Sequence, residues 1–286
     1  MVSPRAAWQC CLYSLSKRKS NPMLLAMLIV LLVYLDSILS PIRAFLSAYQ
    51  VPINGVGLYP YLLADREFVM FCGIALLMLF SDCPFMDEAQ QSVILRSGQL
   101  NWIWGQIGYI LLGCLLLLAG IFLLVCAFLL PYVELSAQWG KAMNTLIQTN
   151  TASRFYLMTE FFSPIQQAFQ PLPALFAGLA LRWACFSACV LLMFFVNLIT
   201  RSKAGALAAL AILIMDYVVE VTMPKRYSIL SPSTLARLDI LAMGESAYYP
   251  DALAGVAVVA MFFLLSLCLV LLAHKRRDMT DMMIRD

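Results

Sequence analysis

Three carboxylates lie within apolar stretches of this sequence: Asp36, Asp216 and Glu220. An acid at membrane depth is costly unless it faces water, a polar cavity or a partner. Asp216 and Glu220 are four residues apart, which places both side chains on one face of a helix. The three are therefore candidates for a translocation path, with a proton relay as one form of it. The alternative is simple solvation near the outer surface, because Glu220 closely precedes Lys225 and Arg226.

Signatures of catalysis and nucleotide binding are missing. The run 244–246 (Gly-Glu-Ser) is followed by Tyr248 and not by the glycine of a serine-hydrolase elbow. His274 is the one histidine, so a His-Glu-x-x-His zinc helix is impossible. Gly140-Lys141 lacks the remainder of a phosphate-binding loop. We therefore expect no enzyme, no catalytic residue, no metal ligand and no cofactor bound by this chain.

The composition of the whole chain indicates whether it is soluble or lies in a membrane. The 286 residues are 63% hydrophobic and 12% charged, whereas soluble domains carry about 25% charged residues. The chain is therefore expected to be an integral membrane protein. Its net charge of +3 is small and its basic residues form no single stripe, so nucleic acid is not an expected partner.

Hydrophobic runs predict one all-α transmembrane domain with six spans. A bilayer requires ~20 apolar residues per helix, and the spans fall at about 23–41, 61–81, 105–130, 178–200, 204–223 and 252–273. The second is the weakest, because the apolar run 68–80 must recruit residues 58–63 to reach this length. Outer segments are expected at 132–177 and 224–251. Arg182 is expected to snorkel from the outer end of the fourth span.

Basic residues set the orientation of the six spans. Short loops on one side hold Lys17, Arg18, Lys19, Arg96, Arg201, Lys203, Lys275, Arg276 and Arg277. The positive-inside rule makes this side, with both termini, cytoplasmic. Residues 1–21 are expected to form an amphipathic cytoplasmic helix, because Trp8, Leu12 and Leu15 recur at helical spacing.

Residues 82–104 form the longest polar stretch on the expected inner side. Pro84 suits the first turn of a helix, where Asp87 and Glu88 would favourably meet the positive end of its dipole. Trp102 and Trp104, like Trp8, are expected to anchor the chain at the headgroup layer. A helix presented in this way is a docking surface for a soluble partner; the alternative is a solvated connecting loop.

This layout resembles the membrane subunit of six-span ABC exporters, whose ATPase is a separate chain. The local match is the stretch 80–107, which contains Trp102-Ile103-Trp104-Gly105-Gln106. The resemblance implies a coupling helix at about 85–96, and its expected contacts with the ATPase subunit are Pro84, Phe85, Asp87, Glu88, Gln91 and Arg96. It also implies ATP and Mg on that partner, a second permease subunit (the same chain or another) and a bacterial cytoplasmic membrane.

The cargo implied is a peptide, a lipid or a hydrophobic compound. Two alternatives stay open. One is an ion- or proton-coupled secondary transporter that uses Asp36, Asp216 and Glu220. The other is a non-transporting immunity or scaffold subunit of the membrane.

Overall fold

A computed structural model describes residues 3–18, 22–84, 88–149, 154–157, 159, 161, 163–200, 202–243 and 251–276. The fold is all-α, as predicted. Its helices are α1 (Pro4–Arg18), α2 (Pro22–Tyr49), α3 (Gly55–Ala64), α4 (Arg66–Phe80), α5 (Glu88–Ser97), α6 (Gln99–Phe128), α7 (Gly140–Gln148), α9 (Ser163–Ala168), α10 (Pro171–Thr200), α11 (Gly205–Thr222), η1 (Lys225–Leu230), α12 (Pro232–Leu235), α13 (Leu238–Ala242) and α14 (Ala252–Arg276). Two short strands, β1 (Ile53–Asn54) and β2 (Val133–Glu134), pair in parallel.

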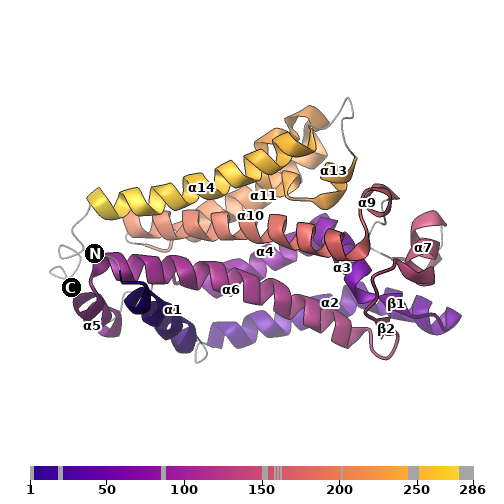
Figure 1. Cartoon of the computed structure of the whole chain (residues 1–286), viewed down its shortest axis with the longest axis horizontal. Helices are drawn as coiled ribbons and strands as arrows, with labels where there is room; N and C mark the ends of the chain where they lie inside the picture. Colours follow the sequence, from indigo (N-terminus) through magenta and orange to yellow (C-terminus); the bar gives the residue numbers. More distant parts are fainter. Residues whose placement is uncertain are drawn as a thin grey trace.

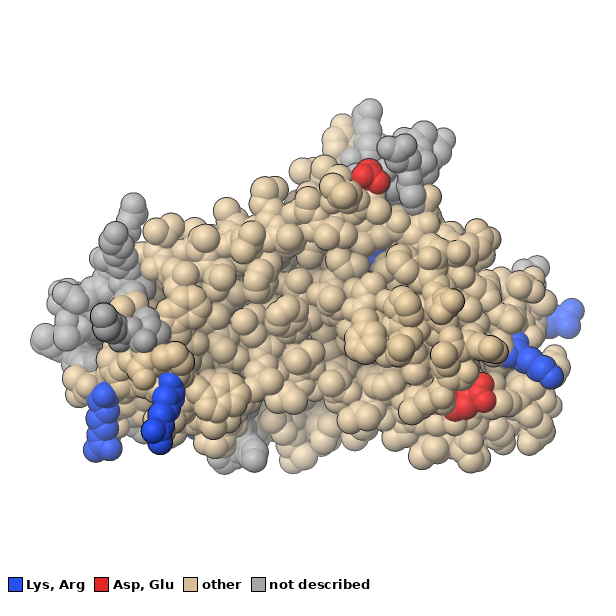
Figure 2. Space-filling model, in the orientation of Figure 1, with Lys and Arg blue, Asp and Glu red and all other residues tan. Residues whose placement is uncertain are grey.

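Within the residues that the structure describes, four helices, α2, α6, α10 and α14, are long and apolar enough to cross a membrane. They run along the long axis of the molecule (Figure 1). Charged side chains gather toward the ends of the visible face, and its broad middle is almost entirely free of them (Figure 2). Length, composition and this distribution indicate a membrane-embedded protein.

The predicted second span is two helices and not one. Asp65 has an extended backbone, with φ −71° and ψ 125°, and it ends α3. Its carboxylate then caps α4 by accepting a hydrogen bond from the Phe68 amide at 2.9 Å. All ten residues of α3 are buried. The residues expected to extend a short span therefore form a separate internal helix.

Asn54 connects the start of α3 to the segment after β2. Its side chain caps α3 through the Val56 amide and donates to the carbonyls of Ser136 and Gln138 at 2.8 and 2.6 Å.

Segment 132–177, expected to lie outside the spans, contains α7 and α9, and α10 begins at Pro171, seven residues before position 178. Likewise, α2 continues past its expected end near Pro41 to Tyr49.

The other end of the molecule carries α1, α5 and the last turn of α14 (Figure 1). Helix α1 packs along the first half of α6. Gly105 permits this approach, because a Cβ at that position would lie 2.5 Å from the Cβ of Cys10. The face of α1 toward α6 includes Cys10, Cys11 and Ser14, all buried, while Trp8 is 55% exposed. We call this end the α5 end and the opposite one the α3 end.

Much of the described part of the predicted outer segment 224–251 is buried within the protein. After η1, residues from Ser231 to Leu241 are buried almost throughout. Helix α12 packs against α11 and α14, and α13 packs against α3 and α10. The segment therefore folds back between the long helices, and this return brings its polar residues to the site described next.

Candidate functional site

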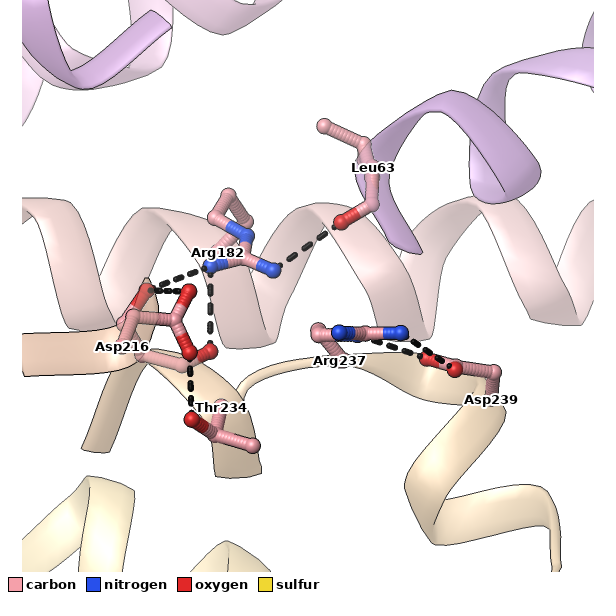
Figure 3. Close-up of polar contacts among 7 residues, drawn as sticks. Leu63, Arg182, Asp216, Thr234, Arg237 and Asp239 are labelled. Atoms are coloured by element: carbon pink, nitrogen blue, oxygen red, sulfur yellow. Dashed lines mark hydrogen bonds and ion pairs between the residues drawn. The ribbon is translucent and has the colours of Figure 1, made fainter. Parts of the chain in front are cut away.

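Arg182 is the centre of a buried polar cluster at the α3 end. Its side chain lies on α10 and is fully buried. One guanidinium nitrogen, Nη2, donates to the carbonyl of Leu63 at 2.9 Å, and Nη1 donates to the carbonyl and hydroxyl of Ser233 at 3.2 and 3.1 Å (Figure 3). A buried guanidinium is tolerated only with such partners. The expectation that Arg182 snorkels to the surface is therefore wrong.

The carbonyl of Leu63 is open to Arg182 because α3 ends there. The last carbonyls of a helix have no partner within it. Asp65 turns the backbone away, and its amide satisfies only the carbonyls of Tyr61 and Leu62. A cation at this position also meets the negative end of the helix dipole. The break between α3 and α4 thus creates half of the binding site for Arg182.

Asp216 on α11 supplies the negative charge of the cluster. It is 4% exposed. Its Oδ2 accepts from the Ser233 hydroxyl at 3.2 Å, and its Oδ1 accepts from the Thr234 hydroxyl. Ser233 receives from Arg182 and donates to Asp216, so a single hydroxyl joins the two charges (Figure 3).

A buried ion pair lies beside this cluster (Figure 3). Arg237 and Asp239 are 5% and 1% exposed, and Arg237 Nη2 contacts Asp239 Oδ2 at 2.8 Å. A further bond joins Arg237 Nε to Asp239 Oδ1 at 3.2 Å, so the pairing is two-pronged. The Arg182 cluster fixes the segment 231–241 against α3, α10 and α11, and the Arg237–Asp239 pair lies within that segment. Their chemistry is that of an internal lock.

A different network holds α5 at the opposite end. Trp102, on the first turns of α6, is fully buried and donates from Nε1 to Gln90 Oε1 at 2.7 Å. Gly98 separates the two helices. Its φ of +80° is a backbone conformation that residues other than glycine rarely adopt. The Gln90–Trp102 bond therefore spans the bend and holds α5 against α6.

Uncharged groups extend this network to α1 and α10. Gln106 Nε2 donates to the Ser14 hydroxyl at 2.9 Å, and the Cys83 thiol donates weakly to Gln106 Oε1 at 3.8 Å. The carbonyl of Cys83 accepts from Asn197 Nδ2 at 2.7 Å, while Asn197 Oδ1 accepts from the Gly205 amide at 2.8 Å. These hydrogen bonds link α1, α6, the residues after α4, α10 and α11, and none of them is a buried ion pair.

The residues expected to contact a partner ATPase fall partly within the described chain. Phe85 and Asp87 lie outside the described residues, and the side chains of Glu88 and Gln91 are not described. Pro84 is half-buried, and Arg96 is exposed on α5. Helix α5 itself covers most of the expected coupling helix.

The three tryptophans do not share one environment. Trp8 and Trp104 are 55% and 39% exposed, as anchors at a headgroup layer would be. Trp102 is buried against Gln90 and approaches the ring of Phe194 at 6.3 Å. Its expected role as an interface anchor is therefore corrected to a packing and hydrogen-bonding role.

The structure separates the expected path carboxylates. Asp36 is exposed on α2, where it pairs with Arg43 at 3.4 Å. Asp216 is buried in the lock, and the side chain of Glu220 is not described. Helix α4 packs against both α2 and α11, and the two described carboxylates, Asp36 and Asp216, lie on different helices with different partners.

A hollow of about 420 Å³ between α4 and α11 was not anticipated. Its lining includes Arg66, Glu67, Phe71 and Tyr217. The Arg66 guanidinium lies over the Tyr217 ring, 4.8 Å from its centre. The signal in the sequence was the Arg66-Glu67 pair at the start of an apolar run.

Comparison with known proteins identifies no relative: no protein-family model, curated protein or solved structure matches the chain. Function must therefore be argued from the site itself.

Proposed function

We propose that this chain is the membrane-spanning subunit of a bacterial ABC exporter, driven by a separate ATPase subunit. In this proposal the chain crosses the cytoplasmic membrane six times, at α2, at α4 together with α3, and at α6, α10, α11 and α14. Both termini and α5 face the cytoplasm. The observation that carries the proposal is the direct attachment of α5 to α6 by the Gln90–Trp102 bond.

That attachment suits the transmission of movement. Helix α6 continues for 30 residues from the bend at Gly98, a length of about 45 Å at 1.5 Å per residue. A displacement of α5 would be passed to α6 because the buried bond prevents α5 from swinging freely. The Gln106–Ser14 bond would carry the same movement to α1.

The outer face of α5 is the proposed contact with the ATPase. Gln90 and Ile94 face inward, whereas Ser92, Leu95 and Arg96 are exposed. Leu95 is 71% exposed, and it lies beside Arg96, a residue type that is enriched at protein interfaces. Pro84, Phe85, Asp87, Glu88 and Gln91 remain predicted contacts.

The hollow between α4 and α11 supports a second permease subunit. Arg66, Glu67 and Tyr217 would be costly if they faced lipid. A facing subunit would cover them and enclose a path between the two chains. This path would accept an amphipathic cargo, a peptide, a lipid or a hydrophobic compound, because charged and aromatic groups line it together.

The decisive experiment separates docking from folding. We expect Leu95→Glu combined with Arg96→Glu to abolish ATP hydrolysis that co-purifies with the chain and ATP-dependent transport. Arg5→Glu, a charge reversal at an exposed position of α1, is the matched control and should leave both intact. A second disruption, flexible glycines inserted after Gly98, should spare ATPase association but abolish transport. Unchanged transport in both disrupted variants would overturn the proposal.

The burial of Asp216 favours one other candidate, an ion-coupled transporter, since a buried acid can carry a proton. In that case the purified chain would transport without any ATPase, and Asp216→Asn would abolish this activity. Under our proposal Asp216→Asn lowers the stability of the fold, and the transport that remains still depends on ATP.

A further inference from the structure

An apolar groove of about 690 Å³ lies between α1, α2, α4 and α6. Its walls include Leu12 and Leu15 from α1, Leu28 and Leu31 from α2, and Leu117 and Ile121 from α6. The volume falls within the range of about 300 to 1,000 Å³ typical of pockets that enclose a small molecule. Almost the whole lining is aliphatic, so the groove offers little to a polar ligand.

The groove has the length of a lipid chain. Two of its walls, α2 and α6, are helices long and apolar enough to span a membrane. Along α6 the lining runs from Tyr109 to Leu124, about 22 Å at 1.5 Å per residue. One leaflet of the hydrocarbon core is about 15 Å thick. An extended acyl chain therefore fits within the groove along its whole length.

One end of the groove is basic. Ser16, near the end of α1, belongs to the lining. Lys17 follows it directly, and Arg18 and Lys19 continue the sequence. The cation of Lys17, next to a lining residue at the mouth of an apolar groove, matches the charge of a lipid phosphate.

We propose that this groove binds one bilayer phospholipid, with an acyl chain between α1, α2 and α6 and its phosphate at the basic end of α1. The bound lipid fills the space that protein side chains leave between α1 and α2. It acts as a structural wedge that sets the position of α1. This inference goes beyond the transport proposal and does not depend on it.

Gly120 offers a direct way to test occupancy. It lines the groove, and a Cβ placed there meets no other atom within 4 Å, the backbone of its own helix aside. Gly120→Leu should therefore project into the groove, with room for its Cβ, and leucine is also the better helix former. At Gly113, by contrast, a Cβ would lie 2.6 Å from Phe80, so that position is unsuitable.

The experiment uses the full chain reconstituted in nanodiscs of phosphatidylethanolamine and phosphatidylglycerol. The protein is transferred to a mild detergent, and retained phospholipid is counted by native mass spectrometry. We expect the wild-type chain to retain one phospholipid and Gly120→Leu to lose it by at least about tenfold, since losing two buried methylenes already has that effect.

The matched control is Ala119→Leu, which adds bulk at the neighbouring exposed position and should retain the lipid. A second pair tests the opposite wall: Leu24→Trp, inside the groove, should lose the lipid, and Leu25→Trp, 61% exposed, should keep it. Lys17→Glu should reduce retention of phosphatidylglycerol most.

Three results would overturn the proposal. They are equal retention in Gly120→Leu and wild type, equal loss in Gly120→Leu and Ala119→Leu, and a groove that holds single-chain detergent or free fatty acid in preference to phospholipid. Because lipid retention is read without an ATPase, failure of the transport proposal leaves this test unaffected.

Discussion

The polar networks at the two ends of the molecule both hold helices together, but one contains buried charges and the other is neutral. At the α3 end, Arg182 and Asp216 are buried charges that meet through Ser233. At the α5 end, Trp102, Gln106 and their partners are neutral. Buried charges are costly to leave unpaired, whereas neutral hydrogen bonds can be lost at modest cost. The α3 end should therefore resist separation of its helices more strongly than the α5 end does.

The largest effect is expected from Arg182→Leu. It leaves Asp216 charged and buried, so the free energy of unfolding should fall by about 3–5 kcal/mol. Reversible unfolding in mixed micelles of dodecyl maltoside and SDS measures this fall. Combining Arg182→Leu with Asp216→Asn should recover part of the loss, because no unpaired charge is then buried. A double variant less stable than the single one contradicts the charge argument.

Trp102→Phe should have an intermediate and local effect. It leaves the Gln90 carbonyl oxygen without its indole donor, a cost of about 1–3 kcal/mol. Hydrogen exchange should accelerate in the amides of α5 and remain unchanged in α12 and α13. Acceleration in both places would mean that the two networks form one cooperative unit.

Gln106→Leu should cost less than Arg182→Leu, about 1–2 kcal/mol, since Ser14 and Cys83 lose only neutral partners. The same micelle titration gives the number. If Gln106→Leu destabilises the chain as much as Arg182→Leu does, the contrast between a charged lock and a neutral network is wrong.

Asp36→Asn should have the smallest effect. Its pair with Arg43 is exposed, with side chains 57% and 44% accessible, and such pairs contribute about 0–1 kcal/mol. Transport should also be unchanged, which direct uptake or efflux measurements can check. A large loss of transport would restore Asp36 to the translocation path.

Local sequence patterns were sufficient to predict several of the helices. The apolar runs predicted the long helices, and the spacing of Trp8, Leu12 and Leu15 predicted a helix over 1–21 that the structure places at Pro4–Arg18. The polar stretch 82–104 predicted a short helix, found as α5 at Glu88–Ser97. Each of these features depends on residues close together in the chain.

The lock could not be predicted in this way. Arg182 bonds to a carbonyl 119 positions away, and that carbonyl is open only because Asp65 ends α3. The run Leu235-Ala236-Arg237-Leu238-Asp239 contains two charged residues, and their burial as an ion pair depends on how the segment folds back. Trp102 was misassigned because position along the chain does not reveal which face of α6 meets α5.

Unequal helix lengths have a consequence for the surrounding bilayer. Helices α4 and α11 have 15 and 18 residues, or about 22 and 27 Å at 1.5 Å per residue, and they pack side by side. Helices α6 and α10, with 30 residues each, reach about 45 Å. In the proposed six-span arrangement, lipid that faced the short pair of a lone chain would have to thin locally, because the hydrocarbon core is about 30 Å thick. A lone chain would therefore have its greatest hydrophobic mismatch with the bilayer at the α4–α11 face, and the second subunit proposed to cover that face would remove this mismatch.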